Sequence, residues 1–379
     1  MQSKKFVFIF FGFSFFMIFA FLFVIWYRDP LHLYHKPYSY KDEIFGNMRI
    51  ESAGLIKHHD FDSLIFGSSM LENTSAAEAN ANLGGKFMNL SLSGSDFYER
   101  ALILDFAFRH KNFKKIIYSL DTIKFLNQEK GHENYAFSEF DFLYDKDPFN
   151  DIKVYFTDEF LKKIFKFGKK YQCKNSNFDR PKAWFKSKNH SVRFGGFENW
   201  LKYKDDWQIK DSFKDIKNAV SKIKNGKIQS LENLDEQILK SKNYVDEYIL
   251  KFVSQNPQTE FYIVLPPYSR IHNAIEFHTK KRDFLVTKEV LRYLVEQSQI
   301  YKNLKIYAWG DTDYPDDIAN YKDLTHYSHK FNSQMLEYLR DGVGLLTPQN
   351  FDKYYAKFER KSREFDLMPY YEKIKDFTE

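Results

Sequence analysis

The sequence opens with a long apolar stretch, Phe6–Tyr27, in which no residue is charged. As an α-helix its 22 residues would be about 33 Å long, enough to cross the roughly 30 Å hydrocarbon core of a bilayer. Lys4 and Lys5 precede it, and positive charge beside a span favours the cytoplasmic side. Residues 1–28 are therefore predicted to form a cytoplasmic tail and a single-pass anchor in the inner (cytoplasmic) membrane. The rest of the chain would lie outside the cytoplasm, in a periplasmic or extracellular space.

A cleaved signal peptide is the alternative interpretation of this stretch, because it is N-terminal, basic at its start and apolar in its middle. The apolar run is longer than the usual core of about 7–15 residues. It also ends in Val24, Ile25, Trp26 and Tyr27, where a cleavage site would need small residues. Trp and Tyr are typical of the membrane–water interface, so a retained anchor is favoured.

The composition of the remaining chain, about 350 residues, allows one large folded domain or two smaller ones. Cys173 is the single cysteine, so no intramolecular disulfide can form. The 57 basic residues are interspersed with 51 acidic ones, and this mixture does not favour a nucleic-acid partner. The 19% of aromatic residues would suit a sugar-binding surface, but an A/T-rich coding bias explains them more simply.

Short apolar runs alternate with helical patterns after the anchor, which indicates a parallel sheet built from β-α units. Helices are expected at Phe97–His110, Leu234–Ser254 and Lys280–Gln299, where apolar residues recur at helical spacing. A five-stranded parallel sheet in an α/β fold is predicted. The expected strands are Ser63–Phe66, Phe87–Leu92, Lys115–Leu120, Glu260–Leu265 and Leu304–Ala308.

The chain divides into further regions by composition. Residues 29–60 are predicted to be a juxtamembrane connector, because Asp29–Tyr40 is rich in Pro, His and Tyr. Residues 61–345 are predicted to be the folded domain that carries the site. Residues 346–379 are expected to form a C-terminal tail of one or two surface helices.

The interval 126–233 does not follow the β-α rhythm and is predicted to be an insertion between the third and fourth strands. It is polar, aromatic and Lys-rich. Helices are expected at Asp158–Lys170 and Trp207–Lys224, so the insertion should be a folded lobe or lid.

Ser69 is the candidate nucleophile. It ends the turn Gly67-Ser68-Ser69 after the first strand, and ligands of open α/β sheets bind at the carboxyl ends of the strands. A serine hydroxyl needs a neighbouring base to become nucleophilic. Ser69 could instead be an ordinary turn residue, and Ser68 is the alternative nucleophile. The Gly-x-Ser-x-Gly elbow of α/β-hydrolases is absent, because Gly67–Leu71 lacks the second Gly.

Asp323 and His326 are the candidate partners of the serine. An Asp three residues before a His can accept from the imidazole Nδ1–H and leave Nε2 facing the serine. Asp323 could instead cap a helix, and His326 could be a cap or a core residue. His329 with this pair would pass as a metal site, but no His-rich or Cys-rich segment accompanies it, so no metal or cofactor is predicted. His58, His59 and the other histidines are interpreted as surface residues.

These motifs resemble those of the SGNH-hydrolase superfamily. Its first motif places the nucleophilic Ser after a Gly at the end of strand one, as in Gly67, Ser68 and Ser69, and its last motif is Asp-x-x-His, as in Asp323 and His326. The chain most resembles the membrane-anchored branch, which includes DltD-like proteins of teichoic-acid D-alanylation and the alginate and peptidoglycan O-acetylation proteins. The anchor, and the Ser68 position where soluble relatives carry Asp, point to this branch.

The resemblance implies a flavodoxin-like three-layer α/β/α fold and a set of roles. Ser69 would be the nucleophile, His326 its base and Asp323 the partner of the imidazole. The backbone N–H groups of Ser69 and Gly94 would form the oxyanion hole. The third motif, Gly-x-Asn-Asp, is missing, and an anionic Asp121 in its place would repel an oxyanion if it pointed there.

The expected activity is an acyltransferase or esterase acting on O-acyl groups of a cell-envelope glycan. The resemblance implies an acyl donor and a multi-spanning membrane O-acyltransferase as partners. The missing third motif leaves open a catalytically inactive SGNH-like scaffold that partners such an acyltransferase.

Overall fold

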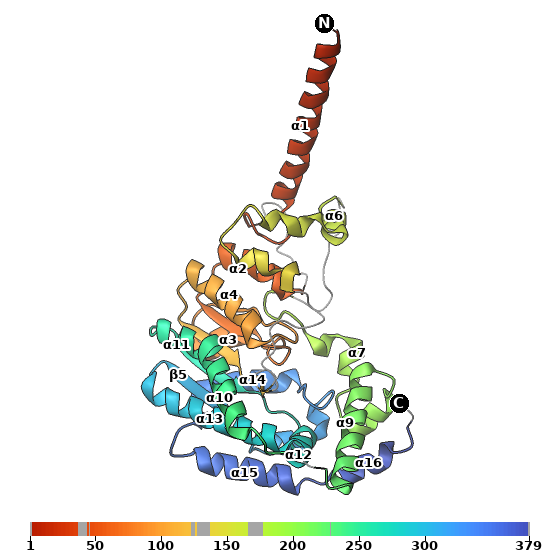
Figure 1. Ribbon diagram of the computed structural model, residues 1–379, viewed down its shortest axis with the longest axis vertical. Coiled ribbons are helices and arrows are strands. Elements are labelled where there is room, and N and C mark those ends of the chain that lie inside the picture. The colour runs from red at the N-terminus through yellow and green to blue at the C-terminus, as the bar shows by residue number, and fades with distance from the viewer. Residues whose placement is uncertain are drawn as a thin grey trace.

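The computed structural model describes residues 2–36, 44, 46–122, 126, 137–165, 177–227 and 229–377. Cys173 and the end of the helix predicted at Asp158–Lys170 lie outside these residues. Helix α1 (Gln2–Arg28) projects from the folded body (Figure 1) and is long and apolar enough to span a membrane. The Phe side chains between Phe6 and Phe19 are all exposed, and a helix that is apolar on all sides is stable only in apolar surroundings.

A mostly parallel six-stranded sheet lies at the centre of the body, in the order β2-β1-β3-β4-β5-β6. The prediction of five parallel strands missed β6, which pairs antiparallel with β5. A two-residue strand leaves no periodic pattern in the sequence, so this miss has a simple cause. The strands are β1 (Ser63–Phe66), β2 (Phe87–Asn89), β3 (Lys115–Ser119), β4 (Glu260–Leu265), β5 (Leu304–Ala308) and β6 (Leu345–Leu346).

Two strands end earlier than predicted, β2 by three residues and β3, which stops at Ser119, by one. β2 stops at Asn89, although the Leu90 and Leu92 N–H groups still donate to Ile65 O and Gly67 O at 2.9 and 2.8 Å. The predicted run therefore continues alongside β1 without being a regular strand.

Apolar cores cover both faces of the sheet, because residues on each strand alternate between them. Leu64 and Phe66 of β1 join one core, and Ile65 joins the other. Strands covered on both faces are expected to be apolar throughout, which explains the short apolar runs in the sequence. The first face is covered by α2 (Met48–His58), α4 (Phe97–His110), α10 (Leu234–Val245), α11 (Lys251–Gln255), α13 (Lys281–Ile300) and α15 (Phe351–Glu364), and the second by α3 (Ala76–Leu83), α9 (Trp207–Lys224), α12 (Arg270–Thr279), α14 (His329–Asp341) and α16 (Met368–Ile374).

Local capping explains where several of these helices start. Ser75 accepts a hydrogen bond from the Glu78 N–H at the start of α3, and Asp96 accepts one from Glu99 at the start of α4. Ser and Asp at this position satisfy N–H groups that have no partner within the helix. α10 and α11 are joined by a π-helical turn, Asp246–Leu250, so the single helix predicted at Leu234–Ser254 is interrupted.

Helix α2 lies within the range predicted as the connector and packs against α4. Arg49 of α2 forms a buried ion pair with Glu99 at 2.9 Å. The prediction that His58 and His59 are surface residues was wrong. His59 is buried with its Nε2 2.9 Å from His32 Nδ1, and the half-buried His58 has its Nε2 3.2 Å from Leu33 O. The chain after α1 folds back over α2, a contact that the sequence does not reveal.

The insertion covers both faces instead of forming one lobe. Its first part packs with the core of α2 and α4, and its second part, which ends with α9, packs with the core that contains α14. It contains short 3₁₀ and α elements: η1 (Phe137–Glu139), η2 (Asp141–Tyr144), η3 (Asp151–Phe156), α6 (Asp158–Phe165), η4 (Trp184–Lys186), α7 (Lys188–Ser191) and α8 (Phe197–Lys202).

The strand order creates a topological switch point beside β1. The chain passes from β1 to β2 on one side and then returns to β3 on the other, so the loops that follow these strands diverge. Ligands of open α/β sheets bind in the crevice at such a point, outside the carboxyl ends of the strands. The segment directly after β1 is therefore where this fold is expected to hold a site.

Candidate active site

The structure brings Ser69, His326 and Asp323 together, although Ser69 and His326 are 257 positions apart in the chain. Ser69 follows β1, and the other two lie in the loop before α14. Ser69 Oγ is 2.9 Å from His326 Nε2. His326 Nδ1 is 2.9 and 2.8 Å from the two carboxylate oxygens of Asp323. At these distances the three side chains are hydrogen-bonded in series, from the Asp323 carboxylate through the His326 ring to the Ser69 hydroxyl.

The conformation of the loop that carries Asp323 and His326 is fixed by hydrogen bonds within the loop and to the segment next to Ser69. Asp323 Oδ1 accepts from the N–H groups of Thr325 and His326 at 3.0 and 2.9 Å, which fixes the turn. An antiparallel bridge between Tyr321 and Tyr327 closes the loop. The Tyr327 hydroxyl donates to Met70 O at 2.8 Å and so ties the loop to the segment next to Ser69.

Asp323 is not a helix cap, which was the alternative interpretation. The N-cap of α14 is Ser328, whose side chain accepts from the Lys330 N–H. His329, at the start of α14, has its ring stacked on that of Phe185 with the centroids 4.1 Å apart. Within the described part of the chain, no group of three His, Cys, Asp or Glu side chains is arranged to hold a metal ion.

Burial and charge act in opposite directions on the pKa values of this pair. Burial alone would raise the pKa of Asp323, but the charges of His326 and Lys322 and the hydrogen bonds from His326 outweigh it and hold the pKa well below its usual range. Burial lowers the pKa of His326, and the Asp323 charge opposes this only in part. At neutral pH the imidazole is therefore neutral and its Nε2 can accept a proton.

Lys322 is a site residue that sequence reasoning missed. Its buried Nζ is 3.3 Å from Asp323 Oδ2 and 2.8 Å from Gln208 Oε1, and it lies 4.5 Å from the centre of the Trp184 ring. Burial lowers the pKa of this amine. A lysine directly before the Asp-x-x-His motif was visible in the sequence, but its burial was not.

Ser68 points away from the imidazole. Its hydroxyl donates to Asp121 Oδ1 at 2.7 Å and accepts from the Met70 N–H at 3.3 Å. The predicted nucleophile Ser69 has the hydroxyl that meets His326, so the geometry favours it over Ser68.

Asp121 is occupied by a cation and by hydroxyl groups. The buried Arg100 forms an ion pair with it, and the Ser119 hydroxyl donates to its Oδ2 at 2.8 Å. Arg100 also donates to Ser119 O at 2.7 Å and to Ser95 Oγ at 2.8 Å. The charge of Asp121 is thus compensated, which weakens the repulsion that it would exert on an oxyanion. The sequence offered no signal for Arg100.

Gly94 lies in the left-handed region with φ 65°, where a residue without a Cβ is favoured. Across the described residues, neither the Ser69 nor the Gly94 backbone N–H has a hydrogen-bond acceptor. Gly94 lies in the loop after β2, whose Leu92 N–H donates to Gly67 O at 2.8 Å, two residues before Ser69. An N–H group without an internal partner that lies next to a nucleophile can donate to a developing oxyanion, so both groups are candidates for this role.

Part of the insertion, residues 177–186, lies across the site and is called the strap here. The rings of Trp184 and His326 pack in a T-shaped arrangement, with centroids 4.8 Å apart and an angle of 81° between the ring planes. Trp184 N donates to Asn73 Oδ1 at 2.8 Å. Lys182 Nζ donates to Ser93 Oγ at 2.7 Å and lies 3.6 Å from the buried Glu72 carboxylate. The strap was not predicted, beyond the expectation of a lobe or lid.

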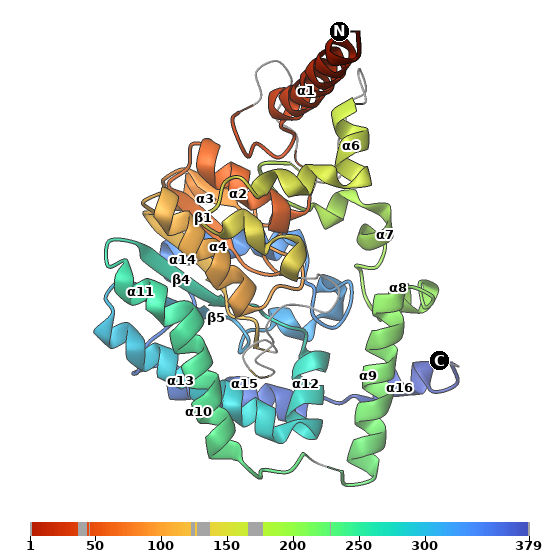
Figure 2. The same ribbon diagram turned by 45° about the horizontal axis from the view of Figure 1, so that its top comes forward.

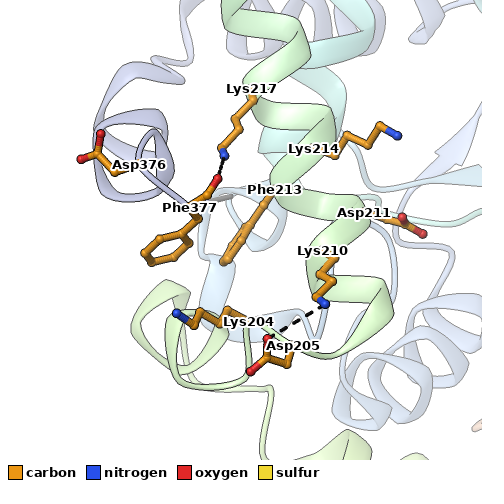
Figure 3. Close-up of a pocket in the computed structure, with 9 residues that line it drawn as sticks. All are labelled: Lys204, Asp205, Lys210, Asp211, Phe213, Lys214, Lys217, Asp376 and Phe377. Atoms are coloured by element: carbon orange, nitrogen blue, oxygen red, sulfur yellow. Dashed lines mark hydrogen bonds and ion pairs between the residues drawn. The ribbon is translucent and has the colours of Figure 1, made fainter. Parts of the chain in front are cut away.

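A separate pocket of about 430 Å³ lies between α9 and the end of α16 and contains none of the predicted site residues (Figure 3). Both basic and acidic side chains surround it, and Lys217 donates to Phe377 O. It is lined by Lys204, Asp205, Lys210, Asp211, Phe213, Lys214, Lys217, Asp376 and Phe377.

Comparisons with known proteins assign no family. No family model matches the sequence, and no curated protein matches it. One solved structure is similar to this chain; its description names a platelet activating factor from Streptococcus pneumonia. The matched region covers 78% of this chain and 91% of the other chain. The two share 12% identity with a TM-score of 0.37, which is too distant to support an argument about this chain.

Proposed function

We propose that this chain is a membrane-anchored, serine-dependent acyltransferase or esterase of the SGNH type. The observation that carries the proposal is the hydrogen-bonded chain from Asp323 through His326 to Ser69 at the switch point of the sheet. The order of the first five strands, 2-1-3-4-5, is that of flavodoxin-like sheets and supports the three-layer α/β/α assignment.

The mechanism begins with proton transfer from Ser69 Oγ to His326 Nε2 as the serine attacks an acyl carbonyl. Asp323 stabilises the imidazolium that forms. The N–H groups of Ser69 and Gly94 hold the oxyanion of the tetrahedral intermediate. His326 then returns the proton to the leaving oxygen, and an acyl-enzyme ester remains on Ser69. A second hydroxyl, from an acceptor or from water, then attacks the ester carbonyl while His326 Nε2 takes its proton. The second tetrahedral intermediate collapses as His326 returns the proton to Ser69 Oγ, and the acyl group leaves on the acceptor oxygen.

The proposed substrates are O-acyl groups of a cell-envelope glycan. Helix α1 supports this choice, because an anchor holds the domain beside a membrane-bound acyl donor. We place the N-terminus in the cytoplasm and the folded body outside it, on the basis of Lys4 and Lys5 before the span. A multi-spanning O-acyltransferase is the proposed donor partner. Transfer to a glycan hydroxyl is favoured over transfer to water.

An inactive SGNH-like scaffold is the second candidate, and the third strand supports it. The Gly-x-Asn-Asp motif is replaced by Ser119–Thr122, and Asp121 is committed to Arg100 and Ser68. None of the four described residues Ser119–Thr122 carries a side-chain amide that could donate to an oxyanion.

Covalent labelling separates the two candidates. The purified full chain is treated with a fluorophosphonate in detergent micelles, and the modified residue is located by mass spectrometry. We expect an adduct on Ser69 that is lost in Ser69→Ala and strongly reduced in His326→Ala. Ser68→Ala is the matched control, because it removes a neighbouring hydroxyl that does not face His326. A folded wild-type chain that takes up no label would support the scaffold instead.

Acceptor preference decides between transfer and hydrolysis. An activated acetyl ester is supplied with and without an envelope oligosaccharide, and acetylated glycan and free acetate are measured. Transfer predicts acetylated glycan at the expense of acetate, whereas an esterase would release acetate at the same rate in both conditions.

A further inference from the structure

The connection between helix α1 and the folded body is a turn that is hydrogen-bonded to the body. The chain turns directly after α1 at Asp29, which has a φ of 27°, a left-handed conformation that Asp tolerates better than most residues. The Asp29 carboxylate accepts from the N–H groups of Leu33, Tyr34 and His35 at 3.0, 2.8 and 2.9 Å. It also accepts from the Tyr155 hydroxyl, which belongs to η3. The junction is therefore fixed to the body by side-chain and backbone contacts.

The last turns of α1 pack against η3 and α6. We call this segment, Asp151–Phe165, the shoulder. Phe21 of α1 stacks on Phe156 of the shoulder with the ring centroids 6.1 Å apart, and Ile25 is fully buried. α6 lies at the foot of α1 in both views (Figures 1 and 2). Phe160 and Ile164 are buried and hold α6 against the body.

The length of α1 determines how deep in the bilayer the contact between α1 and the shoulder lies. A hydrocarbon core of about 30 Å needs about 20 helical residues, which from Phe6 extends to Ile25. Residues 6–20 alone would span only about 22 Å, too little to cross the core. Phe21 lies four residues before Ile25 and so about 6 Å inside the hydrocarbon boundary. The ring centroid of Phe156 is 6.1 Å from that of Phe21, so Phe156 then lies no further out than about the hydrocarbon boundary, where the interfacial layer begins.

The surface of the shoulder fits this position. The Phe156 side chain is half exposed although it stacks on Phe21 of α1. An exposed apolar side chain that adjoins a membrane span is favourably covered by lipid chains. In contrast to the shoulder, the surface formed by α15 and α9 lies at the end of the body away from α1 in both views (Figures 1 and 2).

We propose that the shoulder is a lipid-contacting surface, with Phe156 inserted into the membrane interface on the side of the folded body. This inference rests on the proposed anchoring by α1 and adds that the body sits on the bilayer in one orientation. The partner surface is the interfacial layer of the bilayer itself, where aromatic rings are favoured.

Site-directed spin labelling of the full chain tests this proposal. Cys173 is replaced by Ser, the chain is reconstituted in phosphatidylcholine–phosphatidylglycerol nanodiscs, and one label is placed by Phe156→Cys, Gly12→Cys or Arg360→Cys. Gly12 has open space for a side chain and lies within the span, whereas Arg360 is exposed on α15. Accessibility of each label to oxygen and to a water-soluble nickel chelate gives its depth. Thermal unfolding of each labelled chain verifies the fold.

We expect the label at position 156 to prefer oxygen, as at position 12, and the label at position 360 to prefer the nickel chelate. A label at 156 that prefers nickel while the label at 12 prefers oxygen would overturn the shoulder proposal and leave the anchor intact. Nickel preference at both positions would overturn the anchoring itself and the shoulder with it.

Discussion

At the scale of single residues, the site depends on a balance between burial and charge. Burial lowers the pKa of His326, and the neighbouring Lys322 lowers it further, while Asp323 acts in the opposite direction. Lys322 also helps to keep Asp323 ionised. A buried cation beside the Asp–His pair therefore favours a neutral base and a charged partner at the same time.

Lys322→Met is predicted to shift the acid limb of the pH–rate profile to higher pH. The base works only when His326 is neutral, so activity is lost as the pH falls through its pKa. Removal of Lys322 removes a cause that lowers this pKa, so the pKa rises and the loss begins at a higher pH. The rate of fluorophosphonate labelling against pH measures the shift. Lys302→Met, an exposed lysine before β5, should leave the profile unchanged.

Arg100→Met is predicted to destabilise the fold by about 3–5 kcal/mol, because it leaves the Asp121 charge buried without a partner. The free energy of unfolding is measured by urea titration in detergent micelles. The double variant Arg100→Met, Asp121→Asn should recover part of the loss, since the unpaired charge is gone. Equal stability of wild type and Arg100→Met would show that water or another group already compensates Asp121.

At the scale of elements, the strap joins the insertion to the site. It contacts the segment after Ser69 through Asn73 and Glu72, and it contacts the base through Trp184. The insertion therefore adds side chains to a site whose reactive groups come from the loops of the sheet. These contacts limit the entry of water to the imidazole, consistent with burial as the largest cause of its lowered pKa.

Trp184→Ala is predicted to lower the labelling rate about tenfold or more and to raise the pKa of His326. Loss of the ring removes the packing that orients the imidazole and admits water to it. Labelling rates across pH detect both effects. Trp207→Ala serves as the control, because Trp207 is 69% exposed at the start of α9. A profile that moves equally in both variants would argue against a role for the strap.

At the scale of the whole molecule, the proposed anchoring by α1 predicts which side of the membrane the candidate site faces. With the N-terminus inside, a cysteine at position 360 in a Cys173→Ser chain should react with a membrane-impermeant maleimide in intact cells. Replacing Lys4 and Lys5 by Glu removes the positive charge that favours this orientation, so labelling should fall. Labelling only after cell lysis would reverse the proposed topology.

Local patterns in the sequence determined much of the architecture. The apolar run of α1, the strands at Ser63–Phe66, Glu260–Leu265 and Leu304–Ala308, and the helices at Phe97–His110 and Trp207–Lys224 match the structure. Each is encoded by neighbouring residues, through periodicity, capping or length. The candidate residues Ser69, Asp323 and His326 were found for a similar reason, because short motifs and the ends of strands point to them.

Only the tertiary structure decided which of these residues meet and what surrounds them. Several features of the site and its surroundings depend on contacts between segments that are far apart in the chain. They are the burial of Lys322, the Arg100–Asp121 pair, the contact of Trp184 with His326 and the packing of His59. Contacts of this kind arise from the packing of whole elements against one another, so no local period or spacing records them. The sequence alone therefore pointed to the candidate residues, whereas the fold set their neighbours, the direction of their pKa shifts and the position of the body relative to α1.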